Sequence, residues 1–460
     1  MSPRIRPLVF LTAAAATTVA LTHHRPSLRA DDVYRTASVR ATERGAWTYV
    51  PGEVVVQFRE AVRERDAAEM MREAGGLRAR RSSFGFRYLL ELDAGFQIAD
   101  ALDRLRTMPG VEFAEPNGIV RAFQQRVGFF TPRDPFYTSQ WHFKMLDSER
   151  MWGIQKGDSS VAVAVLDSGI AYEDFGPYRK APDFGNTVFL QGRDLINGDD
   201  HANDDNFHGT HVASTIAEAT DNNVGVAGLA FGCALMPVKV LDNDGVGSFF
   251  IVAEGMDYAV NFTLNGQKPV KVINLSLGGE TSSNAVRQAV DRAVAAGVTV
   301  VAAAGNESAA RIAFPAALPN VIAVGAVDGR KVKAPYSNFG PELTVVAPGG
   351  DIRRDDTGPD GVPDGRPDGV LQQTFDPDTA ERTGRYDDFH YFFVVGTSQA
   401  TPHVAALAAL LYRQGITTPA AIKSAIQTSA EDLGTPGRDD TFGYGLIRPV
   451  PALRGYGLNQ

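Results

Sequence analysis

The feature that most constrains the fold is a series of short, apolar, β-branched segments after residue 134 that alternate with helical patterns. Strands are expected at 161–166, 235–240, 271–275, 298–303 and 321–324, and helices at 209–219, 249–261, 283–296, 399–413 and 418–429. Strands that are apolar throughout are typical of a sheet buried on both faces. The pattern therefore predicts an α/β fold, a doubly wound, mostly parallel sheet with helices on both faces, whose functional residues collect at the carboxyl ends of the strands.

The front of the chain shows a different pattern. Between residues 47 and 121, strand signals at 53–58, 88–92 and 111–117 enclose helix patterns at 62–73 and 98–107. Short strands alternating with helices over this length predict a small α+β domain of the ferredoxin-like kind. The stretch at 122–133 reads as a linker, and the second domain is expected to span 134–460.

The N-terminus and the composition restrict the cellular compartment of the protein and the class of its binding partners. Arg4 and Arg6 precede an uncharged, apolar stretch at 7–22, which predicts a signal peptide within residues 1–30 and a secreted, extracellular protein. The alternative is a frayed hydrophobic terminus; no other segment is apolar enough for a membrane anchor. The single cysteine, Cys233, excludes an intramolecular disulfide, and the net charge of −9 argues against nucleic acid as a partner.

Three polar residues end an expected strand or open an expected helix. Asp167 follows the strand at 161–166, His208 opens a helix in His-Gly-Thr-His, and Ser398 starts a long helix after an apolar strand at 391–395. Taken singly, the aspartate reads as a strand-end cap and the serine as a helix N-cap. The two histidines could form a metal site, but the glutamate of a zincin helix does not lie between them.

Together the three residues can form a catalytic triad. A serine hydroxyl becomes a nucleophile when a base removes its proton, and an imidazole can do this near neutral pH. A buried carboxylate fixes the tautomer of that imidazole and stabilises its charged form. The order Asp, His, Ser along the chain is the order found in subtilisin.

Three motifs make the sequence resemble the subtilisin-like serine proteases, or subtilases, of the thermitase and subtilisin branch. They are Val-Leu-Asp-Ser-Gly-Ile at 165–170, His-Gly-Thr-His-Val-Ala at 208–213 and Gly-Thr-Ser-Gln-Ala-Thr-Pro-His-Val-Ala at 396–405. The resemblance implies a serine endopeptidase that acts through an acyl-enzyme. It assigns Asp167, His208 and Ser398 to the triad and leaves the histidines at 211 and 403 structural.

The resemblance also implies an oxyanion donor and a substrate groove. Asn306, in Ala-Gly-Asn-Glu, would donate to the oxyanion beside the N–H of Ser398. An extended peptide would lie as an added strand between two segments of small residues; these are Gly245, Val246 and Gly247, and Ser276, Leu277 and Gly278. Ala304, Gly305 and Ala313 would line the pocket for the side chain before the cut, with Glu307 at its rim. This pocket is expected to accept large apolar side chains, and Glu307 to favour Lys or Arg.

By the same resemblance, a structural calcium ion is expected. Its ligands would be the side chains of Asp134, Asp183 and Asn222 and the carbonyls of Ala219, Val224 and Val226. Hard oxygen ligands suit Ca²⁺, which would brace a chain that lacks disulfides. Asp199, Asp200, Asp204 and Asp205 form a second candidate site, with a solvated acidic loop as the equal alternative.

Two features depart from the family pattern. Gln399 stands where the family usually has Met after the nucleophile, which removes an oxidisable thioether. An acidic insertion at 350–390 carries Asp356, Asp360, Asp364 and Asp368 at four-residue spacing. It does not fit an EF-hand. The alternatives are a further calcium-binding loop and a disordered acidic flap, and an ordered loop is expected.

The front domain, at 47–121, resembles a subtilase propeptide, an inhibitor-like module that assists folding and blocks the active site until it is cut. Residues 1–133 carry 20 Arg, no Lys and 15 acidic residues, so their positive charge complements the acidic remainder. Cleavage is expected within 121–133. The sequence thus predicts a self-processing zymogen, monomeric and active on proteins or peptides. The alternative is a catalytically silent subtilase scaffold that acts as a binding protein, against which the intact triad argues.

Overall fold

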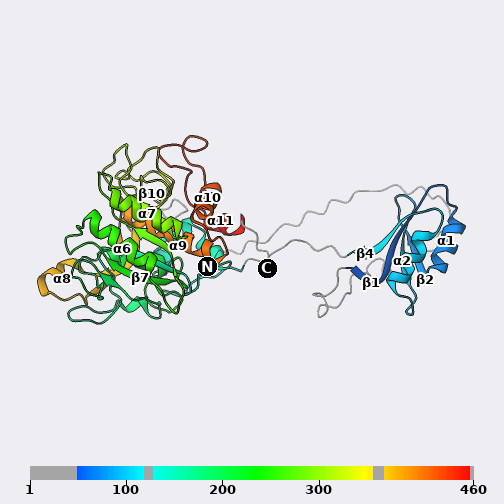
Figure 1. The fold of residues 1–460 in the computed structure, drawn as a ribbon, viewed down its shortest axis with the longest axis horizontal. Helices are drawn as coiled ribbons and strands as arrows, with labels where there is room; N and C mark the ends of the chain where they lie inside the picture. The colour runs from blue at the N-terminus through cyan, green and yellow to red at the C-terminus, as the bar shows by residue number, and fades with distance from the viewer. Residues whose placement is uncertain (1–48, 119–127, 356–366, 456–460) are drawn as a thin grey trace, which may run out of the picture. The chain divides into compact units, whose positions relative to one another are not determined.

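The computed structural model describes residues 49–118, 128–355 and 367–455 (Figure 1). They belong to two compact units, which divide between Gln125 and Arg126. The predicted signal peptide and the 122–127 part of the predicted linker lie outside the described residues. Within the described ranges, no helix has both the length and the apolar character needed to cross a membrane.

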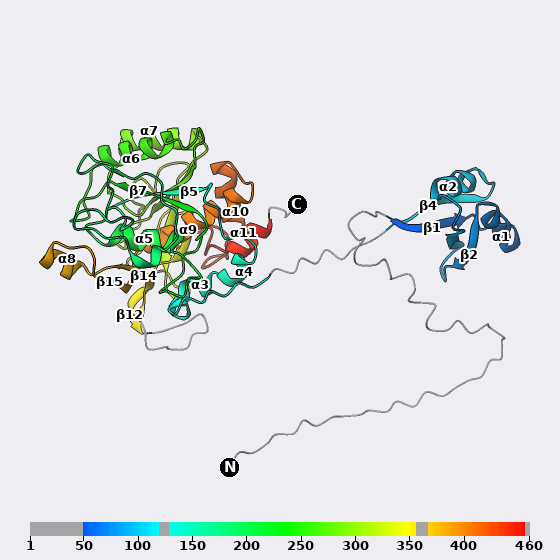
Figure 2. The same ribbon diagram turned by 90° about the horizontal axis from the view of Figure 1, so that it is seen from below.

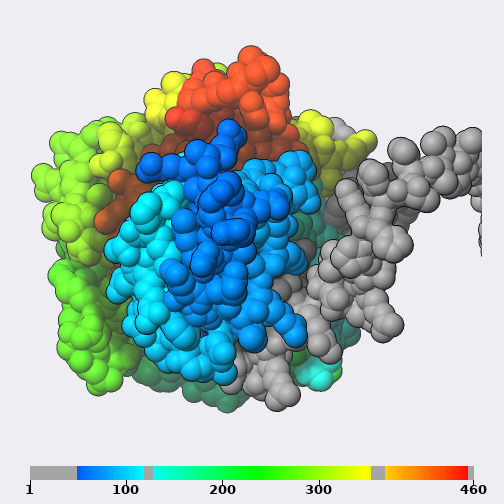
Figure 3. All heavy atoms as spheres, turned by 90° about the vertical axis from the view of Figure 1, so that its right-hand side faces the viewer, coloured from blue at the N-terminus to red at the C-terminus, as the bar shows by residue number. Residues whose placement is uncertain are grey.

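The first unit is a four-stranded antiparallel sheet with two helices. Its elements are β1 (Tyr49–Phe58), α1 (Glu64–Glu73), β2 (Gly76–Arg81), β3 (Arg87–Leu92), α2 (Ile98–Thr107) and β4 (Val111–Gly118). The strand order is β2-β3-β1-β4, and the unit packs into one continuous body, drawn dark blue to cyan in Figure 3. The small α+β layout is the predicted one. Strand β2 was not expected, because its arginines leave no apolar face to read.

The second unit is built on a seven-stranded sheet in the order β11-β10-β9-β8-β5-β7-β6, with parallel neighbours throughout. Its strands are β5 (Ala162–Asp167), β6 (Arg193–Asp194), β7 (Ala234–Lys239), β8 (Val270–Leu275), β9 (Thr299–Ala303), β10 (Ile322–Val327) and β11 (Val345–Pro348). Most of these strand residues are fully buried, as the continuous apolar runs predicted.

Helices cover both faces of this sheet. Figure 2 shows α6 (Phe249–Asn261) and α7 (Asn284–Ala295) on one face, with α5 (His208–Ala217) and α9 (Thr397–Arg413) on the other. The unit also contains α3 (Trp141–Met145), α4 (Ser148–Trp152), α10 (Pro419–Ser429) and α11 (Pro449–Gly455). The predicted doubly wound α/β fold is therefore confirmed.

The strand order reverses at β5. The chain leaves β5 towards β6 and β7 on one side and later returns to β8 on the other side. Ligand sites of open parallel sheets form at such a reversal, outside the carboxyl ends of the strands. Asp167, the last residue of β5, lies at this position.

The segment expected to be an acidic insertion contains regular structure. Strands β12 (Asp351–Asp355) and β13 (Pro367–Asp368) pair antiparallel on either side of 356–366, which lies outside the described residues together with three of the four regularly spaced aspartates. Next, β14 (Val370–Phe375) and β15 (Phe389–Val394) form a hairpin around α8 (Pro377–Thr383). All six residues of β14 are buried, so this strand is part of the folded core, whereas β15 is only half-buried.

Candidate active site

The carboxylate of Asp167 and the imidazole of His208 are joined by a hydrogen bond, with 2.7 Å between Oδ1 and Nδ1. Asp167 is fully buried, and its Oδ1 also accepts from the N–H of Ser168. Burial alone would lower the pKa of His208, but the charge and hydrogen bond of Asp167, together with the charge of Asp204, raise this pKa above its usual value. The arrangement therefore stabilises an imidazolium.

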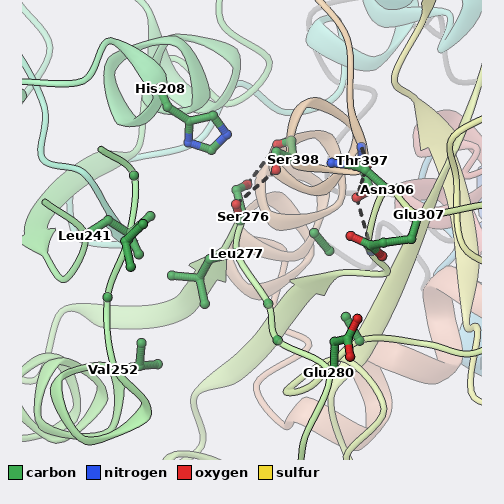
Figure 4. Close-up of a pocket in the computed structure, with 18 of the residues that line it drawn as sticks. His208, Leu241, Val252, Ser276, Leu277, Glu280, Asn306, Glu307, Thr397 and Ser398 are labelled. Atoms are coloured by element: carbon green, nitrogen blue, oxygen red, sulfur yellow. Dashed lines mark hydrogen bonds between the residues drawn. The ribbon is translucent and has the colours of Figure 1, made fainter. Parts of the chain in front are cut away.

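Ser398 lies in the first turn of α9, on the groove that His208 also faces (Figure 4). Its hydroxyl donates to the carbonyl of Ser276 at 2.9 Å, and the Ser276 hydroxyl donates to the carbonyl of Ser398 at 2.8 Å. In this conformation the Ser398 hydroxyl must rotate away from Ser276 to reach the imidazole. Catalytic hydrogen bonds are often completed only when the substrate binds.

Asn306 follows β9 and is fixed by its side-chain oxygen. That Oδ1 accepts from both the N–H and the hydroxyl of Thr397, each at 2.9 Å. The Nδ2 hydrogens are thereby left to donate to a group in the groove. The N–H of Ser398, in the first turn of α9, has no acceptor within the helix. The two donors can serve one developing oxyanion.

A cavity of about 680 Å³ runs past these residues. It is lined by both predicted substrate segments, at 245–247 and 276–278, and by Gly305, Glu307 and Ala313. A Cβ on Gly278 would lie 3.1 Å from the Cβ of Ala313, so a larger residue would crowd the pocket. Ala304 does not line the cavity, because it is fully buried beneath it.

Three further residues at this cavity carry no motif in the sequence. The carboxylate of Glu307 accepts from Nδ2 of the buried Asn338 at 2.6 Å. The side-chain oxygen of Asn338 accepts from the N–H groups of Glu307 and Ala309. The Asn338 side chain therefore fixes the segment that carries Glu307 at the rim of the pocket. Also on the cavity lining, Glu280 and Arg311 form an ion pair at 2.7 Å. These contacts join separate loops, and only the folded chain shows them.

The residues predicted to bind calcium come together around the loop at 219–226. The oxygens of Asp134 accept from the N–H groups of Asp221 and Asn222, at 2.8 and 3.0 Å. Those of Asp183 accept from the side-chain amide of Asn222 at 3.0 Å and from the N–H of Val226 at 2.8 Å. Burial raises the pKa of both carboxyl groups, that of Asp183 to about 6.

Glu218, which the sequence did not single out, adds a third carboxylate beside this loop. Both of its oxygens are buried, with no hydrogen-bond partner within the described residues. Burial and the charge of Asp183 raise its pKa well above the usual value. An excess of buried negative charge and oxygen-only donors fit a hard divalent cation. Within the described ranges no three His, Cys, Asp or Glu side chains have metal-binding geometry, so such an ion would need amide and carbonyl oxygens.

The second candidate calcium site does not form. Asp199 accepts from the N–H of His201 at 2.9 Å, and Asp200 pairs with Arg193 at 2.8 Å. Asp205 pairs with the buried Lys239 at 2.6 Å, and Asp204 is itself fully buried. The four side chains have different partners; Asp204 is fully buried, and Asp205 is largely buried against Lys239. Both sequence interpretations of this loop therefore fail for Asp204 and Asp205.

Comparison with known proteins decides the family. The model of the subtilase family matches residues 158–445, well over half of the chain. The chain belongs to the subtilase family. A second model, the fervidolysin N-terminal prodomain, matches residues 35–117 of this subtilase. The prediction made from the three motifs is thus confirmed, and so is the presence of a prodomain.

Named relatives agree with this assignment. This subtilase is 34% identical to the thermophilic serine proteinase of Bacillus sp. (strain AK1) over 412 residues, 89% of either chain. It is 33% identical to thermitase of Thermoactinomyces vulgaris, over 67% of this chain and 94% of thermitase. A solved protease structure from Pseudoalteromonas arctica matches 71% of this chain and all of its own, with a TM-score of 0.60 and 29% identity. The protein is a subtilisin-like serine protease with an N-terminal prodomain.

Proposed function

We propose that this subtilase is a secreted, calcium-braced serine endopeptidase, made as a self-processing zymogen, with Asp167, His208 and Ser398 as its catalytic triad. One observation carries the proposal. His208, which the buried Asp167 holds through a 2.7 Å hydrogen bond, lines the same cavity as Ser398 and both proposed substrate segments.

The geometry supports acyl transfer by a nucleophilic serine. Because Asp167 holds Nδ1 of His208, Nε2 is the nitrogen that takes the Ser398 proton as Oγ attacks the peptide carbonyl carbon. The resulting oxyanion accepts from Nδ2 of Asn306 and the N–H of Ser398. The imidazolium then protonates the leaving amine. Water attacks the acyl-enzyme by the same route, with His208 again acting as the base.

The groove supports binding of an extended peptide. The segments at 245–247 and 276–278 would pair with the substrate main chain, which makes binding largely independent of side chains. Selectivity then falls to the pocket lined by Gly305 and Ala313. Its apolar walls suit a large side chain, and the carboxylate of Glu307 would attract a basic one.

Processing is proposed to fall between residues 121 and 130, in the front part of the linker. Phe130 packs on Trp152 and Phe231, with ring centroids 6.1 and 5.8 Å apart, and Arg133 pairs with Asp221 at 2.7 Å. A cut before Phe130 leaves both contacts in the mature enzyme. The positive charge of the first 133 residues supports a propeptide that binds the acidic enzyme.

Export and calcium complete the proposal. Arg4 and Arg6 before the apolar stretch at 7–22 support secretion through a signal peptide. For calcium, Asp134, Asp183 and Asn222 would be the side-chain ligands. The ion would neutralise the carboxylates whose pKa values burial raises, and would hold the loop at 219–226.

The test compares the full chain with its Ser398→Ala variant in Ca²⁺ buffer. Intact mass and N-terminal sequencing should show loss of a front fragment, cut between residues 121 and 130, in the wild type only. A fluorophosphonate probe should label Ser398. A wild-type chain that is neither cut nor labelled would favour the silent scaffold. An uncut chain that takes the probe would mean that the prodomain stays attached to a working site.

A further inference from the structure

We propose that Asp204 is a positioning residue of this catalytic site, whose buried carboxylate fixes the end of β5, carrying Asp167, against the start of α5, carrying His208. The inference rests on the proposed function and deepens it. The sequence reading of Asp204 as a calcium ligand or a solvated charge leaves this residue without a role, and its contacts supply one.

The carboxylate of Asp204 accepts five hydrogen bonds from both sides of the site. Its Oδ1 accepts from the Ser168 hydroxyl at 2.8 Å and from the N–H groups of Asn206 and Phe207 at 3.0 and 3.1 Å. Its Oδ2 accepts from the N–H of Thr210 at 2.9 Å and from the Thr210 hydroxyl at 2.6 Å. Asp204 is 1% exposed. All five partners are donors, an arrangement that an ionised carboxylate satisfies and a protonated one does not.

The hydroxyls of Ser168 and Thr210, which both donate to Asp204, also accept hydrogen bonds across the gap between β5 and α5. We call Asp204 with these two hydroxyls the Asp204 clamp. The Ser168 oxygen, next to Asp167, accepts from the N–H of Gly209 on α5 at 3.0 Å. The Thr210 oxygen, on α5, accepts from the N–H of Ala171 in the segment after β5 at 3.0 Å. Each hydroxyl thus belongs to one side, receives a bond from the other, and donates to the same carboxylate. Both side chains are fully buried.

The backbones of the two sides are in direct contact. A Cβ on Gly209 would lie 2.1 Å from the carbonyl oxygen of Gly169 and 3.1 Å from the Cβ of Asp167. At this separation a small slide of α5 along β5 would change the distance between Asp167 and His208. A helix N-cap satisfies donors of one helix only. Asp204 instead bonds both elements, so it sets their register.

The charge of Asp204 also acts on the imidazole, and several groups share this environment. The pKa of His208 is raised by Asp167 and, to a smaller degree, by Asp204, and lowered by burial. Burial raises the pKa of Asp204, which its hydrogen bonds and Lys239 on β7 oppose. Lys239 donates to the carbonyl of Ser168 and to Asp205. His211 on α5 and the hydroxyls of Tyr178 and Tyr386 are further titratable groups close to these residues.

The experiment measures kcat, KM and the pH profile of kcat/KM on a peptide anilide with a large apolar residue before the cut. The full-length chain is used, and rates are expressed per site titrated with a fluorophosphonate. Asp204→Asn should lower kcat by roughly 10²-fold, the scale of a small misplacement at a catalytic site, with KM little changed. Removing the negative charge should also lower the pKa of His208. The pH at which kcat/KM falls on the acidic side of the profile, its acidic limb, should therefore move to lower pH.

Two further variants separate geometry from charge. Ser168→Ala removes one arm of the clamp but keeps the carboxylate, so kcat should fall and the acidic limb should stay in place. Asp200, in the same loop, pairs with Arg193 instead of contacting the catalytic residues. Asp200→Asn therefore removes one charge from this loop and should leave both kcat and the acidic limb of kcat/KM unchanged.

A purely structural Asp204 would lower the melting temperature and nothing else. If Asp204→Asn keeps the wild-type kcat and acidic limb, the proposal is overturned even when the variant melts earlier. If Asp204→Asn does not fold, Ser168→Ala decides, and a wild-type kcat in that variant overturns the proposal. A wild-type chain that neither cleaves the anilide nor takes the probe overturns the proposed function and this inference together.

Discussion

The imidazoles of His142 and His403 are hydrogen-bonded to each other in the core, with 2.8 Å between Nδ1 of His142 and Nε2 of His403. Nδ1 of His403 lies 2.8 Å from the carbonyl of Gln399, which needs a donor, so Nε2 of His403 accepts and His142 donates. Both rings are fully buried, and burial lowers both pKa values, that of His403 to about 3. Because His403 lies on α9, the pair supports the helix that presents Ser398.

This pair should make the fold sensitive to acid. The folded pKa values lie below the unfolded value of 6.5, so their contribution to stability is full above pH 6.5 and is lost as pH falls towards 3. The slope is about 1.4 kcal/mol per pH unit for each imidazole that is protonated only in the unfolded chain. His142→Gln keeps a donor to His403 and removes one titrating group. Urea unfolding between pH 3 and pH 8, in the Ser398→Ala background to prevent self-digestion, should show a shallower slope.

The matched control for this experiment is His390→Gln. The His390 side chain is 56% exposed and is hydrogen-bonded to Asp388 at the surface, so its removal should leave the slope unchanged. An equal slope in His142→Gln and its parent would show that the buried pair does not control acid stability.

Calcium should bind more weakly as the pH falls through about 6. Without the ion, Asp183 contributes stability only while protonated, so that contribution is full below 3.8 and is lost as pH rises through about 6. With the ion, protons compete for the same carboxylate. Titration calorimetry on the Ser398→Ala chain should therefore show affinity rising across this range. Asp183→Asn should weaken binding and cancel the rise in melting temperature that Ca²⁺ gives.

Asp378→Asn, on the exposed helix α8, removes the same charge away from the loop and serves as the control. Calcium affinity that is independent of pH, or equal in Asp183→Asn and wild type, would place the ion elsewhere.

Charges around the cavity should set the preference for the side chain before the cut. Glu307→Gln should lower kcat/KM on Lys and Arg peptides and leave Leu and Phe peptides almost unchanged, because only the basic side chains use the carboxylate. Arg311→Gln should act in the opposite direction, since it removes a positive charge and frees Glu280 from its ion pair. Steady-state rates on peptides that differ only at this residue provide the measurement. Equal selectivity in the two variants would remove the charge argument.

Asn306 should contribute to kcat through its amide hydrogens. The corresponding donor in subtilisin is worth about 10²–10³ in kcat, and Asn306→Leu should show a loss of this size with KM little changed. Asn306→Asp keeps the oxygen that accepts from Thr397 but cannot donate. A comparable loss in both variants assigns the effect to the donor. Full activity in Asn306→Asp would instead show that only the contact with Thr397 matters.

The placement of Asp167, His208 and Ser398 near one another could be predicted from the sequence, because all three stand at element boundaries, where the chain itself fixes their position. Asp167 ends an apolar strand, and His208 and Ser398 open helices, so a parallel sheet brings them to one edge. The segments at 245–247 and 276–278, named from the family resemblance, do line the cavity. The sequence prediction failed for Ala304, because a strand pattern does not decide which way the residue after β9 points.

Buried polar groups were beyond the reach of sequence patterns. Asp204 and Asp205 read like any acidic loop, since their partners Ser168 and Lys239 lie over 30 residues away in the chain. Glu218 and Asn338 carry no motif at all. A polar side chain shows its role only through the donor or acceptor that the fold places against it.

The buried strand β14 joins two parts of the molecule that are remote in sequence. The side chain of Gln373 accepts from the N–H of Asp183, and its carbonyl accepts from the Ser214 hydroxyl on α5. The hydroxyl of Thr374 donates to the carbonyl of Phe207, directly before His208. Because β14 is a single buried strand, contacts made at one of its ends also fix the position of the other. A cation at Asp183 and an inhibitor in the groove should therefore bind cooperatively, each strengthening the other by the same factor.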